Sequence, residues 1–203
     1  MTRDVTFRMA LEFGIGASLA LGRDDGHGGI EVLTTRDLPE RKHGELAVPA
    51  ILAMLKELDL GPKAIDVWVT NRGPGSYSGL RVAYATLKGF LFGRKAAEWV
   101  AVDPLAAMAA AAPTKDGHVA YPLGQQQVAW APYQNRQLVG RWSAIRADDP
   151  RRSGAVAPET VHFDAAFLLR ASVGNAVERW RTPDEWNATV PDYGVATAFK
   201  KAF

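Results

Sequence analysis

A glycine-rich turn, Gly73-Pro-Gly-Ser76, separates a strand-like segment from a helix-like segment and constrains the fold more than any other feature of the sequence. Residues 65–70 are mostly apolar and β-branched, which is typical of a short strand. Residues 77–92 carry apolar side chains at helical spacing, which is typical of an amphipathic helix. A strand, a tight turn and a helix in succession predict an α/β fold.

The preceding residues predict three strands and another helix. Alternation of apolar and polar residues over 5–13 predicts a half-buried strand. Two β-prone segments, 17–21 and 30–34, are separated by a glycine-rich stretch and are expected to complete an antiparallel meander. An amphipathic helix is expected over 43–58, with Pro49 either kinking it or delaying its start.

The second half of the chain repeats this order of strands and helices less clearly. Residues 99–102 predict a strand, and Asp103 with Pro104 predicts the N-cap and first turn of an alanine-rich helix that extends to residue 112. A hairpin turn is expected at 134–137. The later strands are expected over 119–123, 128–133 and 138–145.

Composition narrows the class of protein and its location. The chain has 203 residues, which is enough to bury a core. Its 24 Lys and Arg nearly balance its 22 Asp and Glu, and the sequence contains no basic run typical of a nucleic-acid arm. The absence of Cys excludes disulfides and thiolate metal sites and is typical of a reducing cytoplasm. No apolar stretch approaches the ~20 residues of a membrane span. A soluble, cytoplasmic protein is therefore expected.

The glycine-rich turn allows two interpretations. Backbone N–H groups of Gly73, Gly75 and Ser76 at a helix N-terminus could bind a phosphate, which would make a weak nucleotide site. Alternatively, the glycines only form a tight turn and Ser76 caps the helix, stabilising it by about 1 kcal/mol. The glycine spacing favours the second interpretation, because it matches neither the Walker nor the dinucleotide-binding pattern.

The remaining polar residues predict no catalytic centre. Glu12 is the only carboxylate in the first strand that could hold Mg²⁺ beside such a phosphate, and a glutamate at the rim of the fold or facing solvent is the favoured interpretation. The four histidines are scattered and predict no metal site. His43 and Glu45 could form an acid–base pair, but Glu45 more simply complements a helix dipole. No catalytic residue, metal ion or cofactor is therefore predicted.

Three segments carry a resemblance to a known family. Residues 72–81, Arg-Gly-Pro-Gly-Ser-Tyr-Ser-Gly-Leu-Arg, closely resemble the Gly-Arg-Gly-Pro-Gly-Ser-Phe-Thr-Gly-Leu-Arg signature of the TsaB (YeaZ) family. Residues 41–52 resemble its Gln-His-Ser-Glu-x-Leu-Leu-Pro helix, with Pro49 in the family's own place. Residues 102–109 are similar to its Val-Ser-Thr-Leu-x-Ala-Leu-Ala segment.

The chain also departs from that family. Leu11-Glu-Phe-Gly14 stands where the family has Ile-Asp-Thr-Ser in its first strand, and residues 122–124 stand where it has Asp-Ala-Arg. These departures remove the groups most suited to hold Mg²⁺ and phosphate. The chain therefore resembles a divergent member that lacks catalytic activity.

The resemblance implies a fold and a function. The fold would be actin-like and Hsp70-like, of the ASKHA and ribonuclease H-like class, with two lobes that each contain a mixed sheet flanked by helices. The lobes are expected over residues 1–98 and 99–203, the second being smaller and more divergent. The function would be that of a non-catalytic scaffold in the complex that makes threonylcarbamoyladenosine (t6A) in tRNA. Such a scaffold binds the catalytic paralogue TsaD and the ATPase TsaE, can form a homodimer, and contacts tRNA only indirectly.

Pairing in this family uses the helices of the first lobe, which correspond here to residues 43–58 and 77–92. The implied contact residues are His43, Ile51, Leu55, Tyr77, Leu80, Ala83, Tyr84, Leu87 and Leu91. Two other classes of protein stay open. One is an ATP-dependent enzyme with an actin-like fold that acts at Gly73 to Ser76, and the other is a peptidase of the glycoprotease group.

Overall fold

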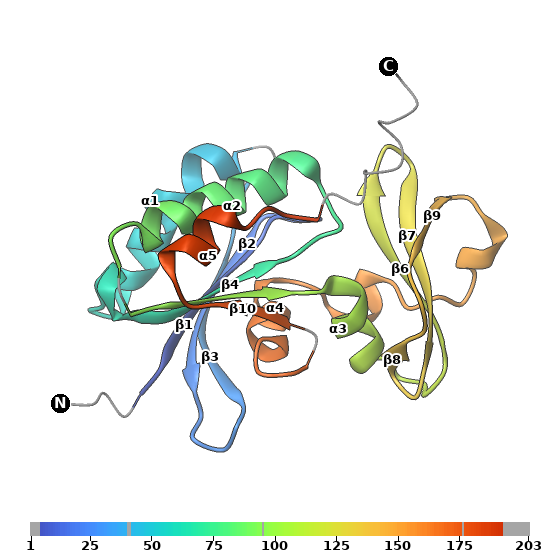
Figure 1. Ribbon diagram of the computed structural model, residues 1–203, viewed down its shortest axis with the longest axis horizontal. Helices are drawn as coiled ribbons and strands as arrows, with labels where there is room; N and C mark the ends of the chain where they lie inside the picture. The colour runs from blue at the N-terminus through green and yellow to red at the C-terminus, as the bar shows by residue number, and fades with distance from the viewer. Residues whose placement is uncertain (1–4, 40–41, 95, 176, 193–203) are drawn as a thin grey trace.

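The computed structural model describes residues 5–39, 42–94, 96–175 and 177–192. Two β-sheets lie side by side, and helices cover both faces of the larger one (Figure 1). Helices α1, α2 and α5 lie on one face, and α4 lies on the other (Figure 1). The α-helices are α1 (His43–Glu57), α2 (Tyr77–Leu91), α3 (Pro104–Ala110), α4 (Ala165–Ala171) and α5 (Pro183–Ala188). Short 3₁₀ helices span Pro62–Ala64, Pro150–Arg152 and Pro158–Val161.

The first sheet has six strands and mixed direction. In order across the sheet, they are β10 (Val177–Trp180), β5 (Glu98–Val102), β4 (Ile65–Asn71), β1 (Phe7–Glu12), β2 (Ser18–Asp24) and β3 (Ile30–Asp37). The first three strands along the chain form the expected antiparallel meander, while β4 runs parallel to both β1 and β5. The carboxyl ends of β1 and β4 therefore meet at one edge of the sheet.

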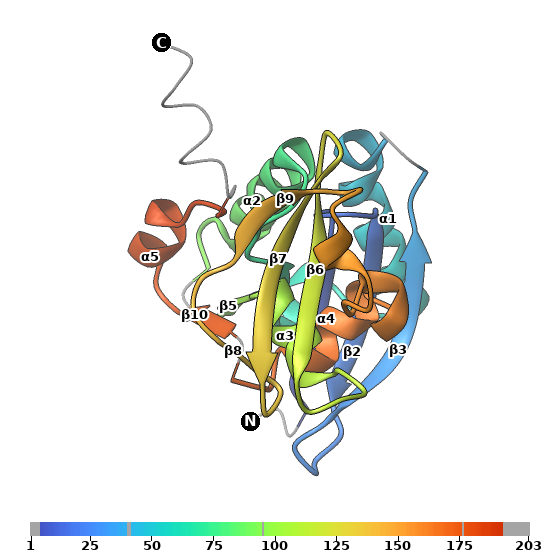
Figure 2. The same cartoon turned by 90° about the vertical axis from the view of Figure 1, so that its right-hand side faces the viewer.

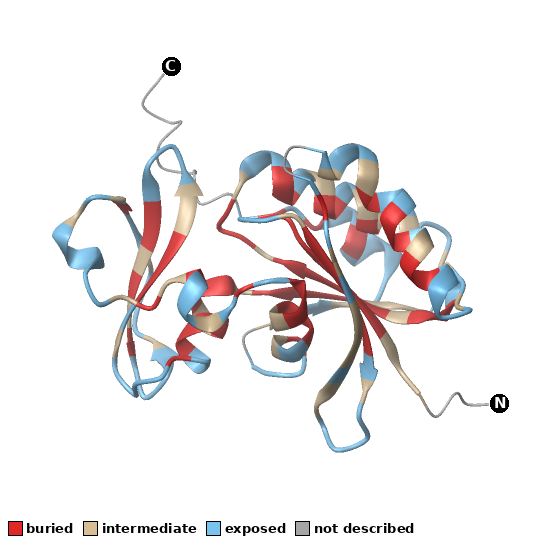
Figure 3. Ribbon diagram, turned by 180° about the vertical axis from the view of Figure 1, so that it is seen from behind, coloured by how far each residue is buried: buried red, intermediate tan, exposed pale blue. Residues whose placement is uncertain are grey.

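Both faces of the sheet are buried at β1, in contrast to the half-buried first strand that the sequence predicts. Met9 and Leu11 pack in the core formed with α1 and α2. Ala10, which points to the opposite face, packs in the core shared with α4, α3 and the second sheet. Figure 3 shows this pattern as buried strands between exposed outer surfaces. The polar residues that alternate along β1 are therefore covered by protein.

Helix α1 begins at His43 and runs through Pro49 without interruption. The expected late start is therefore wrong. Pro49 lies on the exposed face of the helix, where water can hydrate the backbone carbonyl that a proline leaves without a partner.

The second sheet is antiparallel and consists of β6 (Gly117–Gly124), β7 (Gln127–Gln134), β8 (Gln137–Leu138) and β9 (Ser143–Arg146). The expected hairpin turn at 134–137 is confirmed, with Asn135 and Arg136 both at positive φ. The single strand predicted over 138–145 is divided into β8 and β9, and Gly140 between them has a φ of 75°. Figure 2 shows this sheet in front of α3 and α4.

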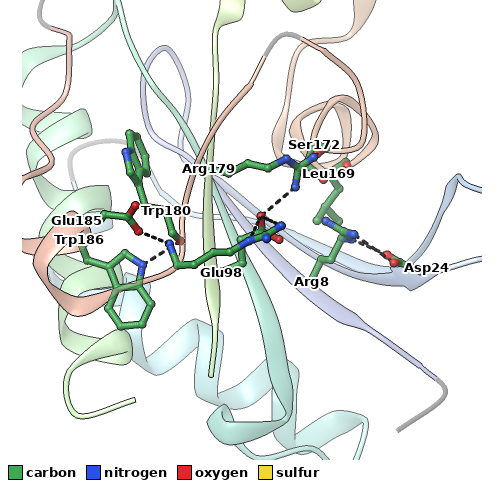
Figure 4. A network of polar contacts seen from close by, with 10 residues as sticks. Arg8, Asp24, Glu98, Leu169, Ser172, Arg179, Trp180, Glu185 and Trp186 are labelled. Carbon is green, nitrogen blue, oxygen red and sulfur yellow. Dashed lines mark hydrogen bonds and ion pairs between the residues drawn. The ribbon is translucent and has the colours of Figure 1, made fainter. Parts of the chain in front are cut away.

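Polar contacts attach the C-terminal part of the chain to the edge of the first sheet (Figure 4). Arg179 lies 3.3 Å from Glu98 of β5 and donates to the carbonyl of Ser172 at 2.7 Å. The Trp186 indole donates to the carbonyl of Trp180 at 3.0 Å. Strands β5 and β10 thus both pair in the first sheet although they follow residue 97, and the division into lobes 1–98 and 99–203 stays a prediction.

Candidate functional site

The loops that follow β1 and β4 pack directly against each other. Ser76 N donates to the carbonyl of Gly14 at 2.7 Å. A Cβ placed on Gly79 would lie 1.7 Å from the carbonyl oxygen of Phe13, and one placed on Gly75 would lie 3.0 Å from Gly14. Glycine is required at 79 because the two backbones approach too closely for a side chain. The glycine-rich turn is therefore built for contact with the first loop.

Glu12 lies at the centre of this junction, with 1% of its surface exposed. Its carboxylate accepts hydrogen bonds from three successive backbone N–H groups, those of Gly14 at 2.8 Å, Ile15 at 3.3 Å and Gly16 at 3.0 Å. The prediction of a rim or solvent-facing glutamate is wrong, because the second sheet and α4 cover the face of β1 to which Glu12 belongs. Three converging N–H groups form an anion-binding nest, and here the chain's own carboxylate fills it.

Two further polar side chains complete a buried cluster around Glu12. Asn71, at the end of β4, donates to Glu12 Oε1 at 3.3 Å and to the Tyr121 hydroxyl at 2.6 Å. Tyr121, on β6, donates to Glu12 Oε1 at 3.4 Å. This Glu12–Asn71–Tyr121 cluster therefore joins two strands of the first sheet to the second sheet through hydrogen bonds between buried side chains.

Burial dominates the electrostatics of the cluster. It raises the pKa of Glu12 above the usual 4.5, against the opposing effect of the hydrogen bonds from Gly16, Asn71, Gly14 and Ile15. Burial, and then the charge of Glu12, raise the pKa of Tyr121 well above 10. Tyr121 therefore keeps its proton and can donate it to the carboxylate.

The raised pKa of Glu12 gives a pH dependence with a definite sign. The folded chain binds this proton more tightly than the unfolded chain, so the Glu12 contribution to stability is fully present below pH 4.5 and declines as pH rises toward the raised value. Glu12→Gln removes this titration. We expect the free energy of unfolding of the wild type, measured relative to Glu12→Gln in urea, to fall as pH rises above 4.5. A difference that stays constant or rises with pH would contradict the assignment.

The glycine-rich turn uses its own polar groups within the chain. Gly73 N donates to Asn71 Oδ1 at 2.7 Å, and Gly79 N donates to Ser76 Oγ at 3.3 Å. A Cβ placed on Gly73 would lie 1.9 Å from the carbonyl oxygen of Asp192, so the C-terminal part of the chain covers this side of the turn. The cap at Ser76 is confirmed. Nucleotide binding at Gly73, Gly75 and Ser76 stays a prediction, and these contacts argue against it.

Ser76→Ala should lower the free energy of unfolding by about 1 kcal/mol, because the N–H of Gly79 loses its acceptor. Ser76→Asp should retain most of the stability, since aspartate also caps helices. Urea unfolding of the three proteins measures both effects. If the alanine variant is as stable as the wild type, Ser76 does not act as a cap.

Asn71 and Tyr121 were not predicted from the sequence. Asn71 carries a signal, because it is a polar residue directly after a buried strand and directly before a glycine-rich turn. Tyr121 carries none, since its place beside Glu12 depends on how the second sheet packs. In the described part of the chain, no group of three His, Asp or Glu side chains is placed to hold a metal ion. No helix in the same residues is long and apolar enough to cross a membrane.

Comparison with known proteins agrees with this geometry. Residues 36–135 match the model of the family described as TsaD, tRNA N6-adenosine threonylcarbamoyltransferase. Among solved structures, YeaZ from Pseudomonas aeruginosa superposes with a TM-score of 0.54 at 22% identity, covering 70% of this chain and 68% of that one. The chain has the YeaZ fold. A second structure, described as similar to peptidase YEAZ from Pseudomonas aeruginosa, gives a TM-score of 0.54 at 21% identity, with coverage of 70% and 67%.

These matches bear on the predictions from sequence. The expected actin-like α/β fold class is confirmed. The expectation that each lobe contains a mixed sheet is wrong for the second sheet, because all of its strand pairs are antiparallel. The resemblance to the TsaB (YeaZ) family is confirmed by the family model and the shared fold, at an identity low enough to make the chain divergent. The matched residues include α1, α2 and the glycine-rich turn between β4 and α2.

Within this YeaZ fold, most of the predicted partner-binding residues are internal. Helices α1 and α2 turn their apolar stripes toward their own sheet, where these side chains form the core. Seven of the nine predicted contact residues are at most 3% exposed: Ile51, Leu55, Leu80, Ala83, Tyr84, Leu87 and Leu91. As surface contacts, these seven predictions are wrong, because the sheet already occupies that face. His43 is partly exposed, and Tyr77 is 55% exposed.

The outer face of the same helices has a different set of residues. Val48 and Leu52 of α1 are 42% and 43% exposed. Ala85 and Gly89 of α2 are exposed as well. Gly44 continues the α1 row and would place a Cβ 3.9 Å from Val82 of α2. We call the set Gly44, Val48, Leu52, Ala85 and Gly89 the outer stripe.

Proposed function

We propose that this chain is a non-catalytic scaffold and activator subunit of a cytoplasmic t6A-forming complex. It binds a TsaD-like catalytic paralogue and a TsaE-like ATPase, contacts tRNA only indirectly, and pairs with a second copy of itself when the paralogue is absent. The match of residues 36–135 to the TsaD family and the YeaZ fold support this assignment.

The outer stripe is the observation that carries the proposal. Its members recur every four residues on each helix, at 44, 48 and 52 and at 85 and 89, so each helix presents one apolar or small-residue row. Glycine and alanine allow another helix to approach closely, while Val48 and Leu52 supply apolar area to bury. A partner with the same fold would bring two equivalent helices, and the four helices can pack as a bundle.

The filled nest at Glu12 supports the absence of catalysis. An enzyme that transfers phosphate needs free N–H donors and cations to bind the transferred group. Here the N–H groups of Gly14, Ile15 and Gly16 already bind a carboxylate, and a phosphate brought close would meet its negative charge. The first loop is therefore unsuited to bind ATP.

Two measurements test the proposal, one on the isolated chain and one on the chain mixed with the TsaD-like protein. Calorimetric titration with Mg-ATP should give no binding in the micromolar range and no hydrolysis. Size-exclusion chromatography with light scattering should show co-elution with the TsaD-like protein encoded in the same genome. Micromolar ATP binding with turnover would favour the ATP-dependent enzyme, and separate elution at micromolar concentrations would contradict the scaffold.

A further inference from the structure

A cavity of about 750 Å³ opens between α3, the β7–β8 turn and the C-terminal end of α4. None of its lining residues belongs to the Glu12 cluster, the glycine-rich turn or the outer stripe. Its volume is within the range of about 300 to 1,000 Å³ that is typical of small-molecule sites. The cavity is therefore a separate feature from the site described above.

Apolar residues form most of the cavity wall. Ala107 and Ala110 of α3 form one side, and Leu138 of β8 and Phe167 of α4 contribute larger apolar surfaces. The alanines keep the space open, because a longer side chain at these positions would extend into it. The alanines of α3 therefore leave room for the cavity, in addition to favouring the helix.

Two arginines supply the only formal charges among the residues that line the cavity, and no carboxylate accompanies them. Arg136 lies in the β7–β8 turn and Arg170 in the last turn of α4. Within the described parts of the chain, neither guanidinium forms a hydrogen bond or ion pair with a protein group. The cavity therefore combines apolar surface with two solvent-exposed arginines that no lining carboxylate neutralises.

The negative ends of the two helix dipoles do not balance the charge of both arginines. The C-terminal ends of α3 and α4 each carry at most about half a negative charge, which two full positive charges exceed. Arg170 can complement the end of its own helix, but Arg136 lies in a hairpin turn with no helix end of its own. Arg136 also has a φ of 62°, a left-handed conformation that glycine or asparagine adopts at lower cost.

We propose that this cavity binds a small monocarboxylate with an aliphatic chain. The aliphatic part packs against Ala107, Ala110, Leu138 and Phe167, and the carboxylate takes up the positive charge of Arg136 and Arg170. This proposal does not depend on the proposed scaffold function. Both arginines are exposed, so a carboxylate can replace water as their partner, whereas an uncharged ligand lacks the charge to do so and an amine would be repelled.

Calorimetric titration of the full chain with four probes tests whether binding needs both the carboxylate and the aliphatic chain. Octanoate should bind saturably at one site, octanol and octylamine should bind at least about tenfold more weakly, and acetate should not bind measurably. The double variant Arg136→Gln with Arg170→Gln should weaken octanoate about tenfold and leave octanol unchanged. Arg141→Gln is the matched control, because Arg141 is exposed and outside the lining, and it should have no effect.

A steric variant checks the location. Ala110→Trp should abolish octanoate binding by filling the cavity, while circular dichroism should stay unchanged because residue 110 is exposed at the end of α3. The proposal is overturned if octanoate does not saturate, if octanol binds as tightly, or if Arg141→Gln weakens octanoate as much as the double variant. Octanoate binding that survives Ala110→Trp in the folded protein also overturns it.

Discussion

Glu12→Ala should destabilise the chain by about 3 kcal/mol, and formate should restore part of that loss. The substitution leaves the buried N–H group of Gly14 and the buried hydroxyl of Tyr121 without their acceptor, and the N–H group of Gly16 loses its acceptor as well. Each buried donor without a partner costs about 1 to 3 kcal/mol, and water entering the vacated space recovers part of the total. Formate has the carboxylate of glutamate without its stem, so it can occupy the same nest. Urea unfolding with and without formate measures the loss and its recovery.

The control for this experiment is Glu159→Ala, which removes an exposed carboxylate. It should change stability by less than about 0.5 kcal/mol, and formate should not affect it. If Glu12→Ala is as stable as the wild type, the nest does not need its carboxylate. Equal responses of both variants to formate would mean that the salt acts nonspecifically.

Two leucine substitutions distinguish the buried face of helices α1 and α2 from their exposed face. Leu87→Glu places a carboxylate in a fully buried position, which should cost more than about 4 kcal/mol and leave little folded protein. Leu52→Glu changes an exposed position four residues before Lys56, where an acidic side chain suits the helix surface. We expect the Leu52 variant to fold normally and to lose co-elution with the TsaD-like partner, because a charge would enter the apolar centre of the interface.

Val139→Glu is the matched control, since Val139 is 44% exposed and lies beyond β8 in the other half of the molecule. It should fold and co-elute like the wild type. Thermal unfolding and light scattering of the three variants give both readouts. A folded Leu87 variant would contradict the burial of that stripe, and a Leu52 variant that still co-elutes would show that the outer stripe is not the interface.

The strand–turn–helix unit could be predicted because its signals are local. The apolar run before Gly73, the cap at Ser76 and the helical spacing after Tyr77 each depend on residues close in sequence. The structure places β4 and α2 within one residue of the predicted bounds. The same holds for the cap at Asp103, where the side chain accepts from Ala106 N at 3.0 Å.

The two errors at the site arise from contacts between distant segments. Alternation along β1 identifies which residues share a face, but not whether a second layer covers that face. Sequence alone therefore predicts Glu12 at the surface. Helical spacing likewise identifies the stripe that contains Leu87, but not whether it contacts a partner or the chain's own sheet. Because a helix on a sheet must bury its apolar stripe, the remaining outer face is the one available for pairing.

Reconstituted t6A formation tests the central claim most directly. The TsaD-like and TsaE-like proteins of the same cell would be incubated with tRNA, ATP and a threonylcarbamoyl donor, with and without this chain. The account predicts that modification depends on the chain, that the Leu52→Glu variant fails to support it, and that Val139→Glu supports it fully. Modification at the same rate without the chain would contradict its role as an activating subunit.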